Sequence, residues 1–174
     1  MFDRTTDKAR LSLLHAQDEA RALGHYFVGT EHLLIAIARS DSPAASLLSS
    51  FGIDADIIRE MVRTTVREGS GKLSGDITLS AFAQQALMVA GRAADTLAHK
   101  APITTLHLLF GIVKIENSAA VNVLEKLGVS KAKALKDVQD KLERLGTPIV
   151  PGSFDSPVFK MSLRMHVHSD TPAE

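Results

Sequence analysis

The sequence contains no cysteine, no tryptophan and a single tyrosine among its 174 residues. Without cysteine it has no disulfide, thiolate zinc site or cysteine nucleophile. Its 20 basic and 20 acidic side chains give a formal net charge of zero, which favours neither nucleic acid nor anionic lipid as a partner. The longest apolar runs, Leu33 to Ala38 and Leu106 to Val113, are too short to span a bilayer, and no signal peptide opens the chain. We therefore expect a soluble, cytoplasmic protein with no nucleic-acid or membrane partner.

Aromatic residues make up only 5% of the sequence, whereas alanine and leucine are frequent. Sheet-rich domains depend on aromatic and β-branched side chains, while alanine and leucine are strong helix formers. A chain of this length usually forms one domain with a sizeable core. The composition therefore predicts an all-α fold.

The sequence contains an internal repeat with a period of about 75 residues. The segment Thr30 to Leu34 recurs as Thr105 to Leu109, and Phe51-Gly52-Ile53 recurs as Leu127-Gly128-Val129. Small differences in offset are expected where duplicated units are joined by loops that tolerate insertions. We predict a double repeat over residues 1–146, with units at 1–72 and 73–146.

Each unit carries start and stop signals for four helices, between which apolar residues recur at spacings of three and four. The starts are hydroxyl or carboxylate caps, one of them followed by proline: Thr6, Thr30, Ser42-Pro43, Asp54, Ser80, Thr104 or Thr105, Ser118 and Ser130. Gly24 and Gly52 are stops, since glycine readily adopts the conformation that ends a helix. The prediction is eight helices in two pseudo-twofold four-helix repeats.

The glycine-rich connector over residues 68–75 is a linker rather than a nucleotide site. Gly71-Lys72 resembles the end of a phosphate-binding loop, but that loop requires glycine where Val66 stands and a hydroxyl where Leu73 stands. We therefore expect no nucleotide and no other cofactor.

Four motifs of the first unit carry a family resemblance: Phe2-Asp-Arg-Thr-Thr-Asp-Lys-Ala9, Ala16-Gln-Asp-Glu-Ala20, Leu23-Gly24-His25 and Gly29-Thr-Glu-His-Leu-Leu34. They resemble the amino-terminal domain of the Clp/Hsp100 unfoldases, especially the ClpC branch. The resemblance covers about residues 1–146 and includes the duplication. It implies an eight-helix pseudo-dimer that receives substrates and adaptors ahead of an ATP-driven ring. The chain itself carries no ATPase motif, so we expect it not to hydrolyse ATP and not to be an enzyme.

The resemblance also implies a binding site for phosphorylated arginine in each repeat. In ClpC-like domains the motif glutamate pairs with the guanidinium group, and the start of the unit's first helix takes the phosphate; both are sound chemistry. The first site would comprise Thr6 and Glu31, with backbone amides near Asp7 and Lys8. The second would pair Ser80 with position 106, which is Leu106, so this site is degraded. Alternatively, Glu31 only stabilises a helix start, by about 0.3–1 kcal/mol.

Two further groups of residues follow from the resemblance and the repeat. A peptide groove between the halves would comprise Phe2, Arg10, Leu13, Leu14, Gln17, Leu79 and Gln84. His32 and His107 recur inside a leucine-rich helix start, which favours buried, hydrogen-bonded histidines over catalytic ones. His15, His25 and His99 are expected to be solvated, and we expect no catalytic residue and no metal site.

The tail after Gly146 has a different pattern. Residues 147–157 contain three prolines, whereas 158–168 alternate apolar and polar side chains as a half-buried strand does. The strand would pair with a second copy to form a homodimer, join a partner's sheet, or remain disordered until bound. His166 and His168 share one face of it but are too few to hold a metal.

The sequence as a whole favours a non-enzymatic protein-binding module of bacterial protein quality control. It would capture clients or adaptors, among them phosphoarginine-marked proteins, for a Clp ATPase/protease system or in competition with it. The alternative is a structural oligomerisation protein that assembles through the tail strand and whose peptide site no longer binds.

Overall fold

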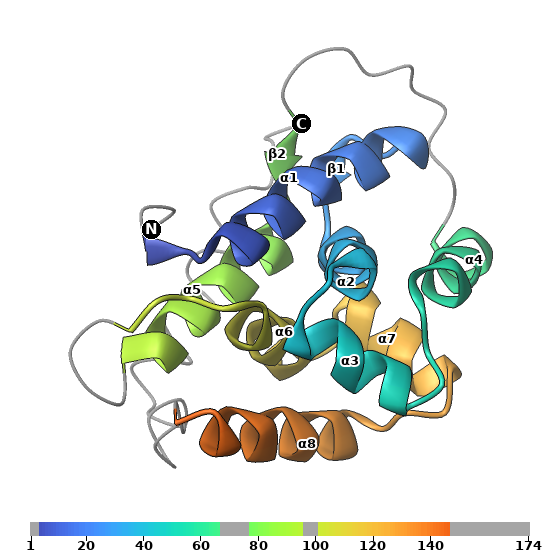
Figure 1. Ribbon diagram of the computed structural model, residues 1–174. Helices are drawn as coiled ribbons and strands as arrows, with labels where there is room; N and C mark the ends of the chain where they lie inside the picture. Colours follow the sequence, from blue (N-terminus) through green and yellow to red (C-terminus); the bar gives the residue numbers. More distant parts are fainter. Residues whose placement is uncertain (1–3, 67–76, 96–100, 147–174) are drawn as a thin grey trace.

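The computed structural model describes residues 4–66, 77–95 and 101–146, which form eight helices and one pair of two-residue strands (Figure 1). The predicted all-α fold is confirmed. The first repeat contains α1 (Asp7–Ala22), β1 (Phe27–Val28), α2 (Thr30–Arg39), α3 (Pro43–Ser50) and α4 (Ala55–Thr65). The second contains β2 (Thr78–Leu79), α5 (Ala81–Asp95), α6 (Thr105–Lys114), α7 (Ala119–Lys126) and α8 (Lys131–Arg144).

The helices α2 and α6 form the centre of the molecule and contact each other across the two repeats (Figure 1). All residues from Thr30 to Ile37 and from Thr105 to Val113 are buried. A helix that is apolar on every side is stable only when other helices surround it. Here α1, α3, α4 and α7 pack around α2, and α5, α7 and α8 pack around α6.

The two repeats exchange backbone hydrogen bonds in a crossed, reciprocal manner. In one half the N–H of Thr6 donates to the carbonyl of Ile103 at 3.0 Å, and Thr5 and Ile103 form a parallel bridge. In the other half the N–H of Ser80 donates to the carbonyl of Val28 at 3.0 Å, beside the parallel β1–β2 pair. The segment before the first helix of each repeat therefore lies against the segment before the second helix of the other repeat.

Most helix boundaries agree with the predicted caps. The hydroxyls of Thr6, Ser42, Ser118 and Ser130 and the carboxylate of Asp54 each accept a backbone N–H in the first turn that follows. Gly24 and Gly52 have φ angles of 68° and 75°, the left-handed conformation that glycine adopts easily.

Three expectations differ from the structure or fall outside it. Thr30 does not cap α2; Gly29 holds that position, and the Thr30 hydroxyl accepts from the N–H of Ala120 at 3.2 Å. The β1–β2 pair was not expected, because two residues per strand are too few to give an alternating pattern. The tail prediction, including the strand at 158–168, lies outside the described residues.

Gly111 on α6 lies where α5 packs closely against α6. A Cβ atom at this position would lie 2.1 Å from the carbonyl oxygen of Ala86 on α5. Because the neighbouring atom belongs to the backbone of α5, a Cβ at this position would fit only if α5 and α6 moved apart. The glycine is therefore required by space, although glycine is a poor helix former.

We predict that Gly111→Ala lowers the free energy of unfolding by about 1–3 kcal/mol, as overpacking of a core does. Helix propensity alone gives the opposite sign, a gain of about 1 kcal/mol. Urea denaturation followed by circular dichroism measures the change. The exposed Asn122→Ala on α7 is the control, with an expected change within about 0.5 kcal/mol. A stabilised Gly111→Ala protein contradicts the packing described.

Candidate functional site

The central helices α2 and α6 both begin at a buried histidine that caps its own helix. The N–H of Gly29 donates to Nδ1 of His32 at 2.8 Å, and the N–H of Thr104 donates to Nδ1 of His107 at 3.2 Å. Both side chains are completely buried, which confirms the expectation from the repeat. Burial lowers the pKa of His32 to about 3, with a further contribution from His25, and lowers that of His107 to about 4. Both imidazoles are therefore neutral at physiological pH.

Next to the first of these histidines, Glu31 is a buried carboxylate. It is 7% exposed, and within the described residues no lysine or arginine pairs with it. Burial raises the pKa of Glu31, although hydrogen bonds from its own backbone N–H and from Thr30 and the charge of His25 act against this effect. A Cβ on residue 29 would lie 2.3 Å from both carboxylate oxygens, so the glycine provides the space that Glu31 occupies.

His25 contacts this cluster through a hydrogen bond whose direction is fixed. Nδ1 of His25 lies 2.7 Å from Nε2 of His32. Because Nδ1 of His32 accepts from Gly29, its proton must be on Nε2, which donates to His25. His25 is therefore a hydrogen-bond acceptor at Nδ1, and the expectation that it is simply solvated is wrong. The same arrangement is not seen at His107, whose Nε2 has no partner among the described residues.

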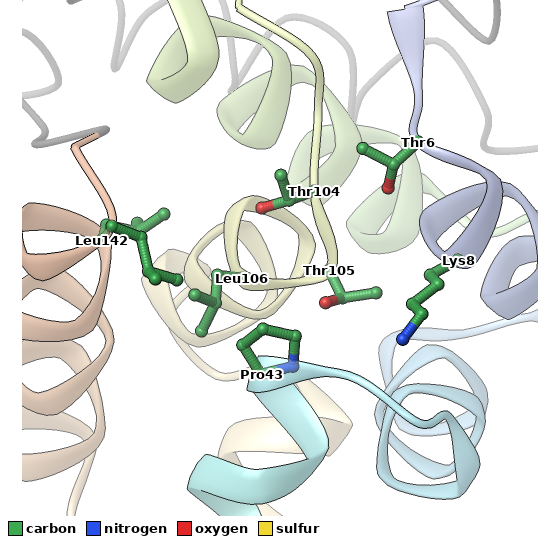
Figure 2. Close-up of a pocket in the computed structure, with 8 residues that line it drawn as sticks. Thr6, Lys8, Pro43, Thr104, Thr105, Leu106 and Leu142 are labelled. Carbon is green, nitrogen blue, oxygen red and sulfur yellow. The ribbon is translucent and has the colours of Figure 1, made fainter.

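A pocket of about 240 Å³ lies at the corresponding position of the other half (Figure 2). Its walls are largely apolar, with hydroxyls and one amine on one side: Thr6, Lys8, Pro43, Thr104, Thr105, Leu106, Leu142 and Leu145. Thr6 caps α1 by accepting from the N–H of Ala9, and Nζ of Lys8 is held by Asp41. The pocket thus joins the start of α1 to the start of α6.

The structure groups the predicted site residues differently from the pairs suggested by the resemblance, and the site itself stays a prediction. Thr6 and Lys8 line a pocket with Leu106, and Glu31 is not among its lining residues. Ser80, which caps α5 by accepting from Ala83 N–H at 3.2 Å, is bonded instead to the strand that leads into Glu31. The physical reason is the crossed exchange between repeats, which local sequence patterns do not reveal. Asp7 is exposed at the first position of α1, where it forms an ion pair with Arg10.

The nitrogen and oxygen ligand atoms of His25, Glu31 and His32 lie within 4.8 Å of one another, a spacing that a metal ion can use. The tautomers argue against this use. A neutral histidine that binds a metal through Nε2 carries its proton on Nδ1, but Nδ1 of His32 already accepts from Gly29. Metal binding would break the cap of α2, so the cluster fits a proton-linked network better than a metal site.

Comparison with known proteins identifies the family. The family model for the Clp repeat N-terminal domain matches residues 4–101 and again residues 78–160. The chain belongs to this family. Clp N-terminal domains are non-catalytic protein-binding modules of Clp chaperone systems.

Relatives of this Clp N-terminal domain include rice ClpC1, a chloroplastic chaperone protein, which is 34% identical over 158 residues. A ClpA homologue from Cyanidium caldarium is 37% identical over 139 residues. These alignments cover 88% and 79% of the chain but only 17% and 16% of the relatives, so the chain spans about a sixth of their length.

Among solved structures, the N-terminal domain of ClpD from Arabidopsis thaliana matches with a TM-score of 0.69 and 26% identity over 82% of this chain and 97% of that one. The Hsp104 N-terminal domain from Candida albicans, at 17% identity over 83% of this chain and 93% of its own, shares the fold with a TM-score of 0.64.

The residues predicted for the peptide groove have different environments in this Clp N-terminal domain. Leu14 is 53% exposed, whereas Leu13 packs against the core. Nε2 of Gln84 donates to the carbonyl of Leu79 at 3.0 Å. Arg10 is exposed and Gln17 half-buried, while Phe2 lies outside the described residues. The groove stays a prediction.

The structure also shows an apolar surface residue that sequence reasoning missed. Phe82 is 41% exposed on the first turn of α5, where the alanine-rich pattern gives no signal for it. None of the described helices is long and apolar enough to cross a membrane. Some relatives are chloroplast proteins, so the cytoplasmic location stays a prediction.

The depressed pKa values of the capping histidines predict that stability falls on acidification. The unfolded chain takes up protons below about pH 6.5 whereas the folded histidines resist protonation, so stability falls from that pH toward pH 4. Each histidine contributes a slope of up to about 1.4 kcal/mol per pH unit. We predict that His107→Asn, whose amide oxygen can still accept from Thr104, lowers this slope. Urea unfolding at pH 7 and 5 measures it, with the exposed His15→Asn as control. Equal slopes in His107→Asn and the unaltered protein contradict the assignment.

Proposed function

We propose that this Clp N-terminal domain captures client proteins or adaptors for a Clp ATPase system, and that its recognition element is the Glu31 site. The observation that carries the proposal is a carboxylate that is 7% exposed and has no lysine or arginine partner within the described residues. Burial of an unpaired carboxylate is costly, and a cationic ligand removes that cost. An arginine side chain is the best fit, because its planar guanidinium group donates two parallel hydrogen bonds to a carboxylate.

Phosphoarginine is the specific ligand that we propose. The start of α5 is joined to the strand before Glu31 through Ser80, so a helix amino terminus and a carboxylate belong to one region. A helix amino terminus favours an anion and a buried carboxylate favours a cation. Phosphoarginine carries both charges on one side chain. The site residues in this proposal are Glu31 and Ser80, in place of the pair Glu31 and Thr6.

The other half is proposed to lack this activity. Thr6 and Lys8 still stand at the start of α1, but Leu106 replaces the carboxylate and makes the pocket apolar. A guanidinium group there would lose its water without gaining an ion pair. The two halves therefore share a backbone arrangement and differ in the side chain that would contact the guanidinium group.

The first test is calorimetric titration of phosphoarginine into the purified protein. We expect about one binding site and at least a tenfold loss of affinity in Glu31→Gln, because a charge-assisted hydrogen bond contributes about 1.5–3 kcal/mol. Ser80→Ala should weaken binding, whereas Thr6→Ala should leave it unchanged. Thr6→Ala is the matched control, since both hydroxyls cap a first helix. Absence of heat with the unaltered protein rejects the phosphoarginine proposal.

The second test restores the missing carboxylate. We predict that Leu106→Glu creates a second site, so that the stoichiometry rises from about one to about two. Because the repeats cross, this new site should depend on Thr6 and not on Ser80. Titration of the double variants Leu106→Glu/Thr6→Ala and Leu106→Glu/Ser80→Ala measures this dependence. The opposite dependence would show that each site is formed within one repeat.

A further inference from the structure

Three groups that can carry a proton lie together at the start of α2. His25, Glu31 and His32 have ligand atoms within 4.8 Å of one another, and the rings of His25 and His32 meet edge to face with centroids 4.9 Å apart. His32 and Glu31 are buried, whereas His25 is only partly buried. The proton exchange of this cluster with solvent therefore takes place most easily at His25.

Protonation of His25 is incompatible with the hydrogen bond that it accepts. Nε2 of His32 carries a proton, because its Nδ1 is occupied by the N–H of Gly29. If Nδ1 of His25 also carried a proton, two N–H groups would face each other across the 2.7 Å between Nδ1 of His25 and Nε2 of His32. The His25 ring must then turn away, and the nearest acceptor in the cluster is the carboxylate of Glu31.

Among the described residues, the other elements around the cluster bring few competing charges. Glu19 on α1 acts electrostatically on His32, but its carboxylate accepts hydrogen bonds from Arg39 of α2 and Arg59 of α4. The α7 contact is an uncharged one between Ala120 N–H and Thr30, and β2 places Thr78 and Leu79 against β1. Within the described residues, the charge that acts on Glu31 is that of His25.

We propose that His25 is a protonation-dependent competitor for the Glu31 carboxylate, so that acidification closes the Glu31 site to a guanidinium ligand. Charged His25 pairs with Glu31 from within the protein and occupies the group that a ligand needs. Neutral His25 accepts from His32 instead and leaves the carboxylate without a charged partner among the described residues. The part concerning ligands rests on the function proposed above, whereas the exchange of partners by His25 does not.

The ligand test compares phosphoarginine affinity at pH 7.5 and pH 6.0 in the unaltered protein, His25→Gln and His15→Gln. Glutamine is neutral and its carbonyl still accepts from His32, while His15 is an exposed histidine on α1 that serves as control. The unaltered protein and His15→Gln should lose more affinity on acidification than His25→Gln, because only they keep a side chain at position 25 that can take up a proton and pair with Glu31. Protonation of the ligand affects all three proteins equally. The same loss in His25→Gln overturns the proposal.

A test without ligand separates this inference from the proposed function. The Nε2 proton of His32 gives an NMR signal that should disappear on acidification, when His25 turns away from His32. In Glu31→Gln the loss should occur at lower pH, because the carboxylate no longer stabilises the charged ring; in His25→Gln the signal should persist. If these shifts are seen and phosphoarginine does not bind, the proposed ligand is wrong and the switch stands. If Glu31→Gln leaves the signal's pH dependence unchanged, the switch is wrong.

Discussion

The capping of α2 and α6 by their own histidines is the interaction on which the rest of the structure depends. Both helices are buried almost along their whole length, so the N–H groups at their starts cannot be satisfied by water. Nδ1 of His32 and Nδ1 of His107 each accept one of these groups from inside the core. This role requires neutral imidazoles and fixes the remaining proton on Nε2. The fold thus determines the tautomers at the candidate site.

The two central helix starts differ at two positions whose side chains affect each other. In the first half Gly29 leaves space that the Glu31 carboxylate fills; in the second, Thr104 and Leu106 stand in the corresponding places. A threonine side chain at position 29 would occupy the space of the carboxylate, so the two positions constrain each other. The two repeats share the helix start and its histidine, and differ in one buried group that is charged in the first repeat and apolar in the second.

The sequence was sufficient to predict the family and most of the helix boundaries, because caps such as Ser42 and stops such as Gly24 act over a few neighbouring residues. The burial of His32 and His107 could also be predicted, because a histidine that recurs at the leucine-rich helix start of both repeats is required by the fold that the repeats share. The segment that lies beside the strand before Glu31 could not be predicted in this way. The contact between Ser80 and Val28 joins residues of different repeats, and a local pattern contains no information on which repeat supplies the neighbour.

The role of His25 was hidden for a related reason. It stands after a helix stop, where a polar residue is ordinarily solvated, and its contact with His32 arises only when the chain turns back beside α2. The orientation of the Gly29 N–H toward His32 then decides which nitrogen of the pair carries the proton.

The crossed exchange of strands has a consequence for how such a domain arose. Half of it, produced as a separate polypeptide, would have its first-helix start and its second-helix start facing outward, each without the segment that completes it. Two identical halves would satisfy each other by forming a symmetric homodimer with two equal sites. In a single fused chain this symmetry no longer applies to the side chains, so one half can carry a glutamate where the other carries a leucine.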